Sequence, residues 1–450
     1  MKQFIDKYGS EIAGVLTGFD RLVFRATPRR LNYCYRDKSR GILVAQGMEE
    51  YLWQNQIRFK DYGRHVQSVS RRLKDHIQKK VLGEQWPIVF LRNQEDKDER
   101  ARQLAEQRQI SSGIVCALSV MEPSPTFEYV RSRIASRIRP CHMYYLYQKH
   151  EELGWMYARI QTWFPFHIQV GINGREWLAR QMQRQGLRYV QQGNCFPWIE
   201  DYGRAQQLLD EQVKTNWMEL LDGFGRQLNP LHEEIFARFP TENYWTCYQS
   251  EWASDVVFRR PEVLKRFMNV VLRHAVSDFS CRDVLRYFGR RLTQKGRIPE
   301  SFNGQLQGNL KEYREGERVK FWMHGNSTKF YDKAYHERGS VMRAAETTIN
   351  KTEVFKSYRA KQGGPEEDLQ WRTMRRGIAD LHRRVQVSQG VNGRLIDALA
   401  TVDDSHRLEE LVSAIQKPTH WNGRRVRALR PFAGNAQAKP PAPPCFHPLL

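Results

Sequence analysis

Alternation of hydrophobic and polar residues predicts an aromatic β-sheet in the middle of the chain. Cys141–Lys149 and Trp155–Thr162 form a predicted hairpin around a short glycine-containing turn, and Phe166–Ile172 is a third strand. Tyr145 and Tyr147 share one face of the first strand, because side chains two residues apart point the same way. We expect these rings to pack in a core. The alternative is a platform on which the bases of a single strand stack.

A second β-rich stretch lies between residues 317 and 350. Its three β-prone runs are Glu317–Met323, Ser327–Lys333 and Ser340–Asn350. The Gly325-Asn326 pair between the first two runs is typical of a two-residue hairpin loop. Because such loops join antiparallel neighbours, we expect an antiparallel β-core here.

The first 125 residues combine strands with helices. A strand at Pro87–Leu91, a highly charged helix at Asp96–Gln109 and an apolar strand at Gly113–Met121 predict a parallel crossover. Pro123 and Pro125 then indicate a domain boundary. Other elements expected in this part are a short strand at Leu22–Arg25 and helices at Gly47–Gln56 and His65–Val81.

Helical periodicity dominates the later segments and brings many arginines together. Gln370–Ala400 carries an apolar stripe that includes Met374, Ile378, Leu381 and Val385. Other helices are expected at Tyr202–Asp222, Pro230–Arg238, Pro261–Ala275 and Arg282–Leu292. The arginines on or beside these helices that we expect to bind a phosphate backbone are Arg259, Arg260, Arg286, Arg290, Arg291, Arg375, Arg376, Arg383 and Arg384.

These elements indicate an α+β, multidomain protein. Changes of composition divide it into a small α/β domain (1–125), an aromatic β-hairpin plus helical domain (126–300), a β-rich core segment (301–360), a basic helical region (361–432) and a Pro-rich disordered tail (433–450). The abrupt change of composition in the tail is typical of a truncated or frame-shifted end.

The balance of charge favours a polyanionic partner. The chain has 72 Lys and Arg against 50 Asp and Glu, a formal net charge of +22. Such an excess favours nucleic acid, DNA before RNA, over a membrane. No apolar run is long enough to cross a bilayer, and the seven cysteines include no C-x-x-C pair. We therefore expect a cytoplasmic nucleic-acid-binding protein.

Candidate chemistry gathers on the second β-prone run. Lys329, Tyr331 and Lys333 fall on one face of that strand. Two ammonium groups can hold a phosphate while the phenol donates a hydrogen bond or attacks as a nucleophile. The alternative is an amphipathic strand with a solvated basic face.

Carboxylates offer a divalent-metal site such as one for Mg²⁺. Glu251 and Asp255 are four residues apart and would share one face of a helix in the segment TENYWTCYQSEWASDVVFRR. Glu346 and Asp332 lie in the β-rich core segment beside Tyr331. Acidic oxygen ligands suit hard divalent cations. The alternative for the Glu251–Asp255 pair is an ordinary solvated helix face.

Several long stretches resemble a widespread bacterial family of uncharacterised proteins, from about Gly18 to Phe432. They are GFDRLVFRAT, RIQTWFPFHIQVGINGREWLARQM, QSEWASDVVF, GNSTKFYDK, ETTIN and MRRGIADLHRRVQVSQ. The resemblance implies no activity. Some relatives in that family continue into a winged-helix-like segment and are named as transcriptional regulators, but this chain reaches its Pro-rich tail first.

A shorter stretch is similar to replication initiators of rolling-circle plasmids and filamentous phages. KFYDK is followed by a strand with Arg and Glu, which in those proteins usually stand two residues apart. Here Arg343 and Glu346 are three apart, which places them on opposite faces of a regular strand, although a bulge at the two intervening alanines would realign them. The H-x-H metal pair of many nicking enzymes is absent from the sequence.

These observations predict a DNA-binding protein of mobile-element origin. The first alternative is a metal-dependent enzyme that nicks or joins DNA, with Tyr331 as nucleophile, Lys329 and Lys333 on the phosphate, and Glu346 with Asp332 or Glu251 on the metal. The second alternative is a non-enzymatic protein that binds another protein.

Overall fold

The computed structural model describes residues 1–30, 42–83, 88–92, 94–277, 279–313, 316–333, 341–361, 365, 367–401, 420–421 and 424–425. The chain divides into two compact units, Met1–Val402 and Asp403–Leu450. In the second unit, β16 (His420–Trp421) pairs antiparallel with β17 (Arg424–Arg425). The predicted Pro-rich tail lies outside the described residues.

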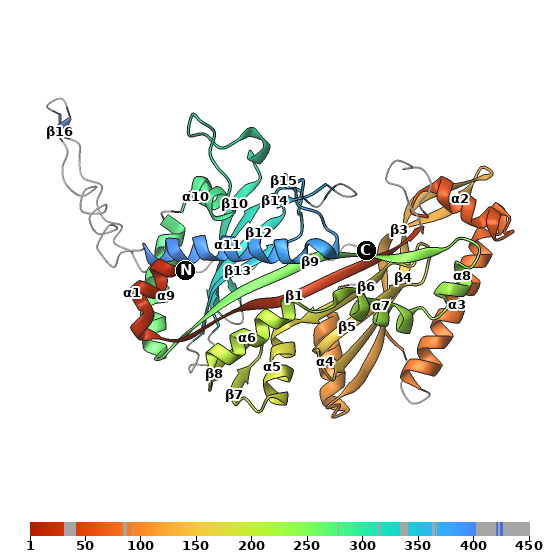
Figure 1. Cartoon of the computed structure of the whole chain (residues 1–450), viewed down its shortest axis with the longest axis horizontal. Helices are drawn as coiled ribbons and strands as arrows, with labels where there is room; N and C mark the ends of the chain where they lie inside the picture. The colour runs from red at the N-terminus through yellow and green to blue at the C-terminus, as the bar shows by residue number, and fades with distance from the viewer. Residues whose placement is uncertain are drawn as a thin grey trace, which may run out of the picture. The chain divides into compact units, whose positions relative to one another are not determined.

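One eleven-stranded sheet organises the first unit, with two long strands, β1 and β9, at its centre (Figure 1). All neighbouring strands are antiparallel except β2 and β3. The strand order is β10 (Leu306–Tyr313), β11 (Gly316–Met323), β12 (Asn326–Asp332), β13 (Val341–Ile349), β9 (Thr241–Phe258), β1 (Ile12–Arg30), β6 (Ile168–Asn173), β5 (Gly154–Gln161), β4 (Arg133–His150), β3 (Gly113–Val130) and β2 (Val89–Leu91).

This sheet, with the helices that cover it, confirms the α+β class. Strands from the first three predicted divisions of the chain are hydrogen-bonded within it, so those divisions fall inside one compact unit. The boundary expected at Pro123 and Pro125 lies within β3. A proline lacks the N–H that a central strand needs. Both prolines are tolerated because β2 ends its pairing at Val120, which leaves this part of β3 paired only with β4.

The structure confirms several predictions that rest on local sequence signals. The charged helix α4 (Lys97–Gln107) connects the parallel strands β2 and β3, which is the predicted crossover. The aromatic hairpin is β4–β5. The β11–β12 loop consists of His324 and Gly325, one residue earlier than predicted, and both have positive φ (48° and 80°). Two positive φ angles match a type I′ turn, which suits the twist of paired strands.

Two segments that were predicted as helices are strands over all or part of their length. The segment with Glu251 and Asp255 is β9, not a helix. Glu251 and Asp255 lie on one face of this strand, while Trp252 and Val256 on the other face are buried in apolar clusters. The predicted helix at Gln370–Ala400 begins as β15 (Gln370–Thr373), paired with β14 (Lys356–Arg359), and only then becomes α11 (Leu381–Ala400).

Helices cover the two faces of the sheet in separate groups. On the β4–β5–β6 half, α4 packs on a cluster that includes Tyr145 and Tyr147, whereas Tyr144 and Leu146 point to the opposite face. Tyr145 and Tyr147 are therefore core residues, as expected, rather than a stacking platform. The helices on that opposite face are α2 (Ala45–Gln54), α3 (Tyr62–His76, continued by a π-helical turn Ile77–Leu82), α7 (Trp217–Leu228) and α8 (His232–Ile235).

The long helix α11 lies across β9 and β13 (Figure 1). Its buried Asn392 donates to the Trp252 and Ala345 carbonyls and accepts from Thr347 Oγ1 at 2.6 Å. Trp252 and Thr347 alternate with Glu251 and Glu346 along their strands, so α11 covers the face opposite these carboxylates. Together with α11, three more helices contribute buried residues to one apolar cluster. They are α1 (Lys2–Tyr8), α9 (Pro261–Ser277) and α10 (Cys281–Tyr287).

Two helices cover the edge of β1 that β6 leaves open. β6 ends at Asn173, whose side chain caps α5 (Gly174–Arg184). In α6 (Tyr202–Val213), the Gln206 side chain accepts from the Thr17 N–H at 2.8 Å and donates to the Thr17 carbonyl at 2.9 Å, as a neighbouring strand would. The β7–β8 hairpin (Tyr189–Gln192, Cys195–Ile199) lies between α5 and α6 in the chain. This arrangement brings Arg175 and Asn194 to the middle of the sheet.

Candidate functional site

A bulge in β13 brings Arg343 and Glu346 to one face. Arg343 pairs with Asp255, and Ala345, rather than Ala344, pairs with the next residue, Ser254. The register to β12 shifts at the same place. The bulge that would realign Arg343 and Glu346 is thus present at the two alanines. Arg343 Nη1 lies 2.6 Å from Glu346 Oε2.

A second bulge, in β1, directs Asp20 toward the same place. Phe19 pairs with Trp252 and Arg21 pairs with Glu251, so Asp20 is the extra residue. Its carboxylate accepts from Asn194 Nδ2 at 2.7 Å and lies 2.8 Å from Arg343 Nη1. The two bulges therefore bring Asp20, Arg343 and Glu346 together on the sheet, in a cluster that we call the polar centre.

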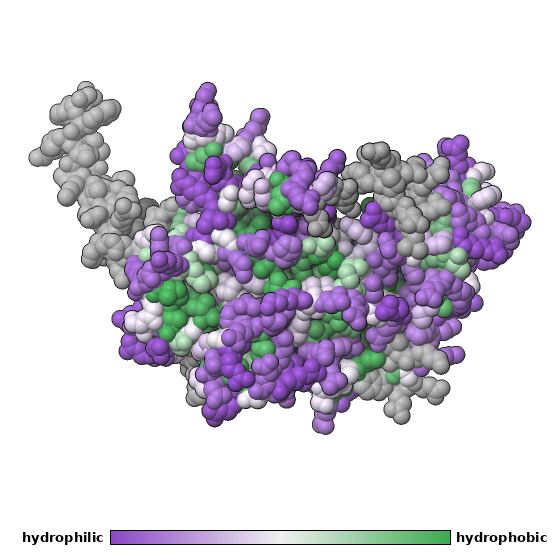
Figure 2. All heavy atoms as spheres, in the orientation of Figure 1, coloured by the Kyte–Doolittle hydropathy of each residue, from purple (hydrophilic) through white to green (hydrophobic). Residues whose placement is uncertain are grey.

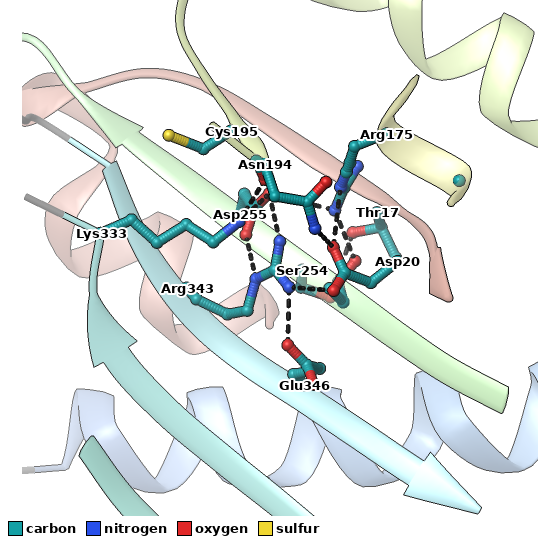
Figure 3. Close-up of polar contacts among 12 residues, drawn as sticks. Thr17, Asp20, Arg175, Asn194, Cys195, Ser254, Asp255, Lys333, Arg343 and Glu346 are labelled. Atoms are coloured by element: carbon teal, nitrogen blue, oxygen red, sulfur yellow. Dashed lines mark hydrogen bonds and ion pairs between the residues drawn. The ribbon is translucent and has the colours of Figure 1, made fainter. Parts of the chain in front are cut away.

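Arg343 is the central cation of this polar centre (Figure 3). It is fully buried, and its Nε and Nη2 donate to the two oxygens of Asp255 at 2.7 and 3.2 Å. Nη1 contacts both Asp20 and Glu346. The pKa of Arg343 is raised well above its usual value, because these carboxylates outweigh the effect of burial. A buried charge persists only with such partners.

Two more cations neutralise the centre. Arg175, also fully buried, lies 3.1 Å from Asp255 Oδ2 and 3.7 Å from Asp20 Oδ1. Lys333 lies 3.9 Å from Asp255 and donates to the Asn194 carbonyl. Burial, reinforced by the nearby Arg343 charge, lowers the pKa of Lys333 to about 8.

Three carboxylates, Asp20, Glu251 and Glu346, converge beside Arg343. One oxygen from each lies within 4.8 Å of the others. Burial and the charge of Glu346 raise the pKa of Glu251 to about 7, whereas Lys329 and Arg343 overcome burial and lower the pKa of Glu346. Carboxylate oxygens at this spacing are the ligands that Mg²⁺ or Mn²⁺ prefers. We call Asp20, Glu251 and Glu346 the carboxylate triad.

The residues predicted around Tyr331 are brought to the triad. Lys329 Nζ lies 2.6 Å from Glu346 Oε1, and the Tyr331 hydroxyl donates to Glu346 Oε2 at 3.4 Å. Tyr331 is only 6% exposed, and burial raises the pKa of its phenol well above the usual value. A neutral, buried phenol is a poor nucleophile, even with Arg318 over its ring at 4.1 Å.

The four predicted metal ligands have different positions. Glu251 and Glu346 belong to the triad. Asp255 instead binds Arg343 and Arg175. Asp332 follows Tyr331 on β12, so its side chain points to the other face. Asp20 was missed, and the only sequence signal was a lone acidic residue inside the β-prone run GFDRLVF.

A polar pocket of about 340 Å³ adjoins the triad. Asp20, Arg21 and Glu251 line it from the sheet, and Asp98 and Arg102 line it from α4. The basic residues continue along β1, where Arg25 donates to Gln169 at 2.8 Å and lies 3.5 Å from the Tyr248 ring centroid. The triad thus lies beside a pocket that also contains cations.

The nine predicted phosphate-binding arginines differ in how exposed they are. Arg259, Arg260, Arg286, Arg291 and Arg376 are exposed, and Arg290, Arg375 and Arg383 are partly buried. Arg384 is 2% exposed and donates to Cys247 Sγ at 2.9 Å, so it is a core residue and the prediction for it is wrong.

Comparisons with protein-family models, curated proteins and solved structures found no match. Among the described residues, no helix has the length and apolar character that crossing a membrane requires. The five cysteines that the structure describes, Cys116, Cys141, Cys195, Cys247 and Cys281, are free thiols.

Proposed function

We propose that the protein binds nucleic acid on the carboxylate-bearing face of the sheet. The observation that carries the proposal is a row of basic residues on both sides of the triad. Arg21 pairs with Glu251, Lys329 pairs with Glu346, and Lys320 pairs with Lys329. Residues directly opposite on neighbouring strands share a face. A phosphate backbone following this row would meet cations on both sides of the triad.

The charge of the chain supports this assignment. A formal net charge of +22 favours encounter with a polyanion, and Arg and Lys side chains bind phosphates with charge-assisted hydrogen bonds. Burial, with the nearby Lys329 charge, lowers the pKa of Lys320. A phosphate between these two lysines would relieve that repulsion.

Binding to labelled DNA and RNA at increasing salt tests the proposal. Affinity should fall ~10³-fold or more between 50 and 200 mM salt if about six phosphates are contacted. Lys320→Ala should reduce the salt dependence, and Lys214→Ala, on the exposed end of α6, is the control. A flat salt response with unchanged Lys320→Ala binding contradicts nucleic-acid binding and favours a protein partner.

The triad supports a second candidate function, metal-dependent cleavage or joining of a phosphodiester. Asp20, Glu251 and Glu346 are the residues that would hold the cation, and the cation would polarise the phosphate. Arg343 already lies between Asp20 and Glu346, so it would share them with the cation and hold them in place.

This second function is tested by incubating nicked, single-stranded and supercoiled DNA with the protein and Mg²⁺ or Mn²⁺. The wild-type protein should cleave or join these DNA substrates. Asp20→Asn should lose this activity while retaining DNA binding. Asp332→Asn is the matched control, because Asp332 points away from the triad. Activity that survives in Asp20→Asn would remove the triad from the reaction.

A further inference from the structure

A groove lies on the other side of the sheet, lined by residues of α11 and of the β14–β15 hairpin. Figure 1 shows these two elements. Its volume is about 390 Å³. Four cationic side chains line it, and none of its lining residues, all of which the structure describes, carries a carboxylate. The four are Arg290, Lys356, Arg383 and Arg394. Because the sheet separates this groove from the carboxylate triad, the two are independent sites.

Two aromatic rings at this groove are unusually exposed. Trp371 is 68% exposed and Tyr358 is 49% exposed. They are directly opposite on β15 and β14, with ring centroids 5.6 Å apart. Around β14 and β15, the surface in Figure 2 carries both hydrophilic and apolar residues. Exposed rings beside cationic side chains are typical of surfaces on which bases stack.

Hydrogen bonds hold the groove walls in place before any ligand arrives. Arg383 of α11 donates to the Tyr358 carbonyl, and Arg394 Nε donates to the Tyr287 carbonyl at 2.8 Å.

We propose that this groove binds single-stranded nucleic acid. One or two bases would stack on Trp371 and Tyr358, and the adjoining phosphates would contact Lys356 and Arg290. A duplex hides its base faces, so it cannot use the two rings in this way. An acidic peptide would use the cations but would gain little from Trp371. The inference does not depend on metal binding at the triad.

The test is fluorescence anisotropy with labelled oligo(dT) of about 15 nucleotides, a length within the usual range for one stacking module. All titrations contain EDTA, so that a metal at the triad does not contribute. Trp371→Ala should weaken binding about 5- to 100-fold. Trp53→Ala is the matched control, because Trp53 is 76% exposed on α2, away from the groove. Thermal melting confirms that both variants are folded.

The outcomes are distinct. Loss of oligo(dT) binding in Trp371→Ala and in Lys356→Ala, with duplex affinity unchanged, supports the groove. Unchanged oligo(dT) binding in Trp371→Ala overturns it, and equal losses for duplex and single strand overturn the assignment to single strands. The same titration with Lys320→Ala separates the two sites. If binding on the carboxylate-bearing face of the sheet fails as a proposal, Lys320→Ala has no effect, whereas Trp371→Ala still weakens oligo(dT) binding.

Discussion

Arg343 and Glu346 form a buried ion pair on one strand, with Nη1 2.6 Å from Oε2, although three positions separate them. The pair exists because β13 bulges between Arg343 and Ala345. The same guanidinium contacts Asp20 and Asp255, which come from β1 and β9. One arginine thus connects the three strands that supply the carboxylate triad.

Removing this guanidinium should strongly destabilise the fold. Arg343→Met leaves Asp20, Asp255 and Glu346 buried without their shared cation, and breaking a buried pair in this way typically costs ~3–5 kcal/mol. Urea denaturation at pH 7 measures the loss. Arg64→Met, at a side chain that is 83% exposed, should change stability by less than ~0.5 kcal/mol. Equal, small losses in both variants would contradict a structural role for Arg343.

A divalent cation should stabilise the protein through the triad. At 100 times its dissociation constant, Mn²⁺ would add ~2.7 kcal/mol, because it binds only the folded state. Thermal melting with increasing Mn²⁺ should show this increase in wild type and in Asp332→Asn. In Asp20→Asn the increase should disappear. A metal response that is the same in all three proteins would place the cation elsewhere.

The raised pKa of Glu251 predicts a pH-dependent gain in Glu251→Gln. In the folded protein this carboxyl has a pKa of about 7, against a usual value of 4.5. Between these values the folded state holds a proton that the unfolded chain releases, so this group lowers stability as pH rises toward 7. Glu251→Gln should therefore stabilise above pH 7, by ~1–2 kcal/mol because solvent screens part of the effect, and not near pH 4. Urea titrations at pH 4.5 and 8 check this, and a gain that is equal at both values contradicts the assignment.

The tyrosine hydroxyl should be dispensable for any DNA cleavage. Tyr331 is buried and its hydroxyl donates to Glu346, so Tyr331→Phe keeps the packing and removes one hydrogen bond of ~0.5–1.5 kcal/mol. We expect metal-dependent nicking, where present, to persist in this variant. Loss of nicking together with loss of a covalent protein–DNA adduct would instead identify Tyr331 as the nucleophile, the alternative that the sequence suggested.

Close packing at the start of α5 predicts different results at two helical glycines. A Cβ on Gly174 would lie 2.1 Å from the Phe19 carbonyl oxygen, next to the bulge at Asp20. Gly174→Ala should destabilise the protein by ~1–3 kcal/mol or more, since backbone must move. A Cβ on Gly223 in α7 meets no atom of the described residues within 4 Å, so Gly223→Ala should stabilise by ~0.5–1 kcal/mol. Denaturation of both variants measures the contrast, and a neutral Gly174→Ala would contradict the packing.

Local pattern alone determined several features of this protein. The β11–β12 hairpin, the β2–α4–β3 crossover and the shared face of Lys329, Tyr331 and Lys333 follow from turn residues, helix periodicity and strand alternation. Each depends on residues close in sequence, so the sequence carries the whole signal.

Tertiary packing decided the rest. β9 is a strand because its neighbours β1 and β13 pair with it, although the spacing of Glu251 and Asp255 suits a helix equally well. The triad needs Asp20, which is over two hundred residues from Glu251 and reaches it only through a bulge. Arg384 is basic in sequence and buried in the fold. Pairings and bulges of this kind depend on distant partners, which local periodicity does not specify.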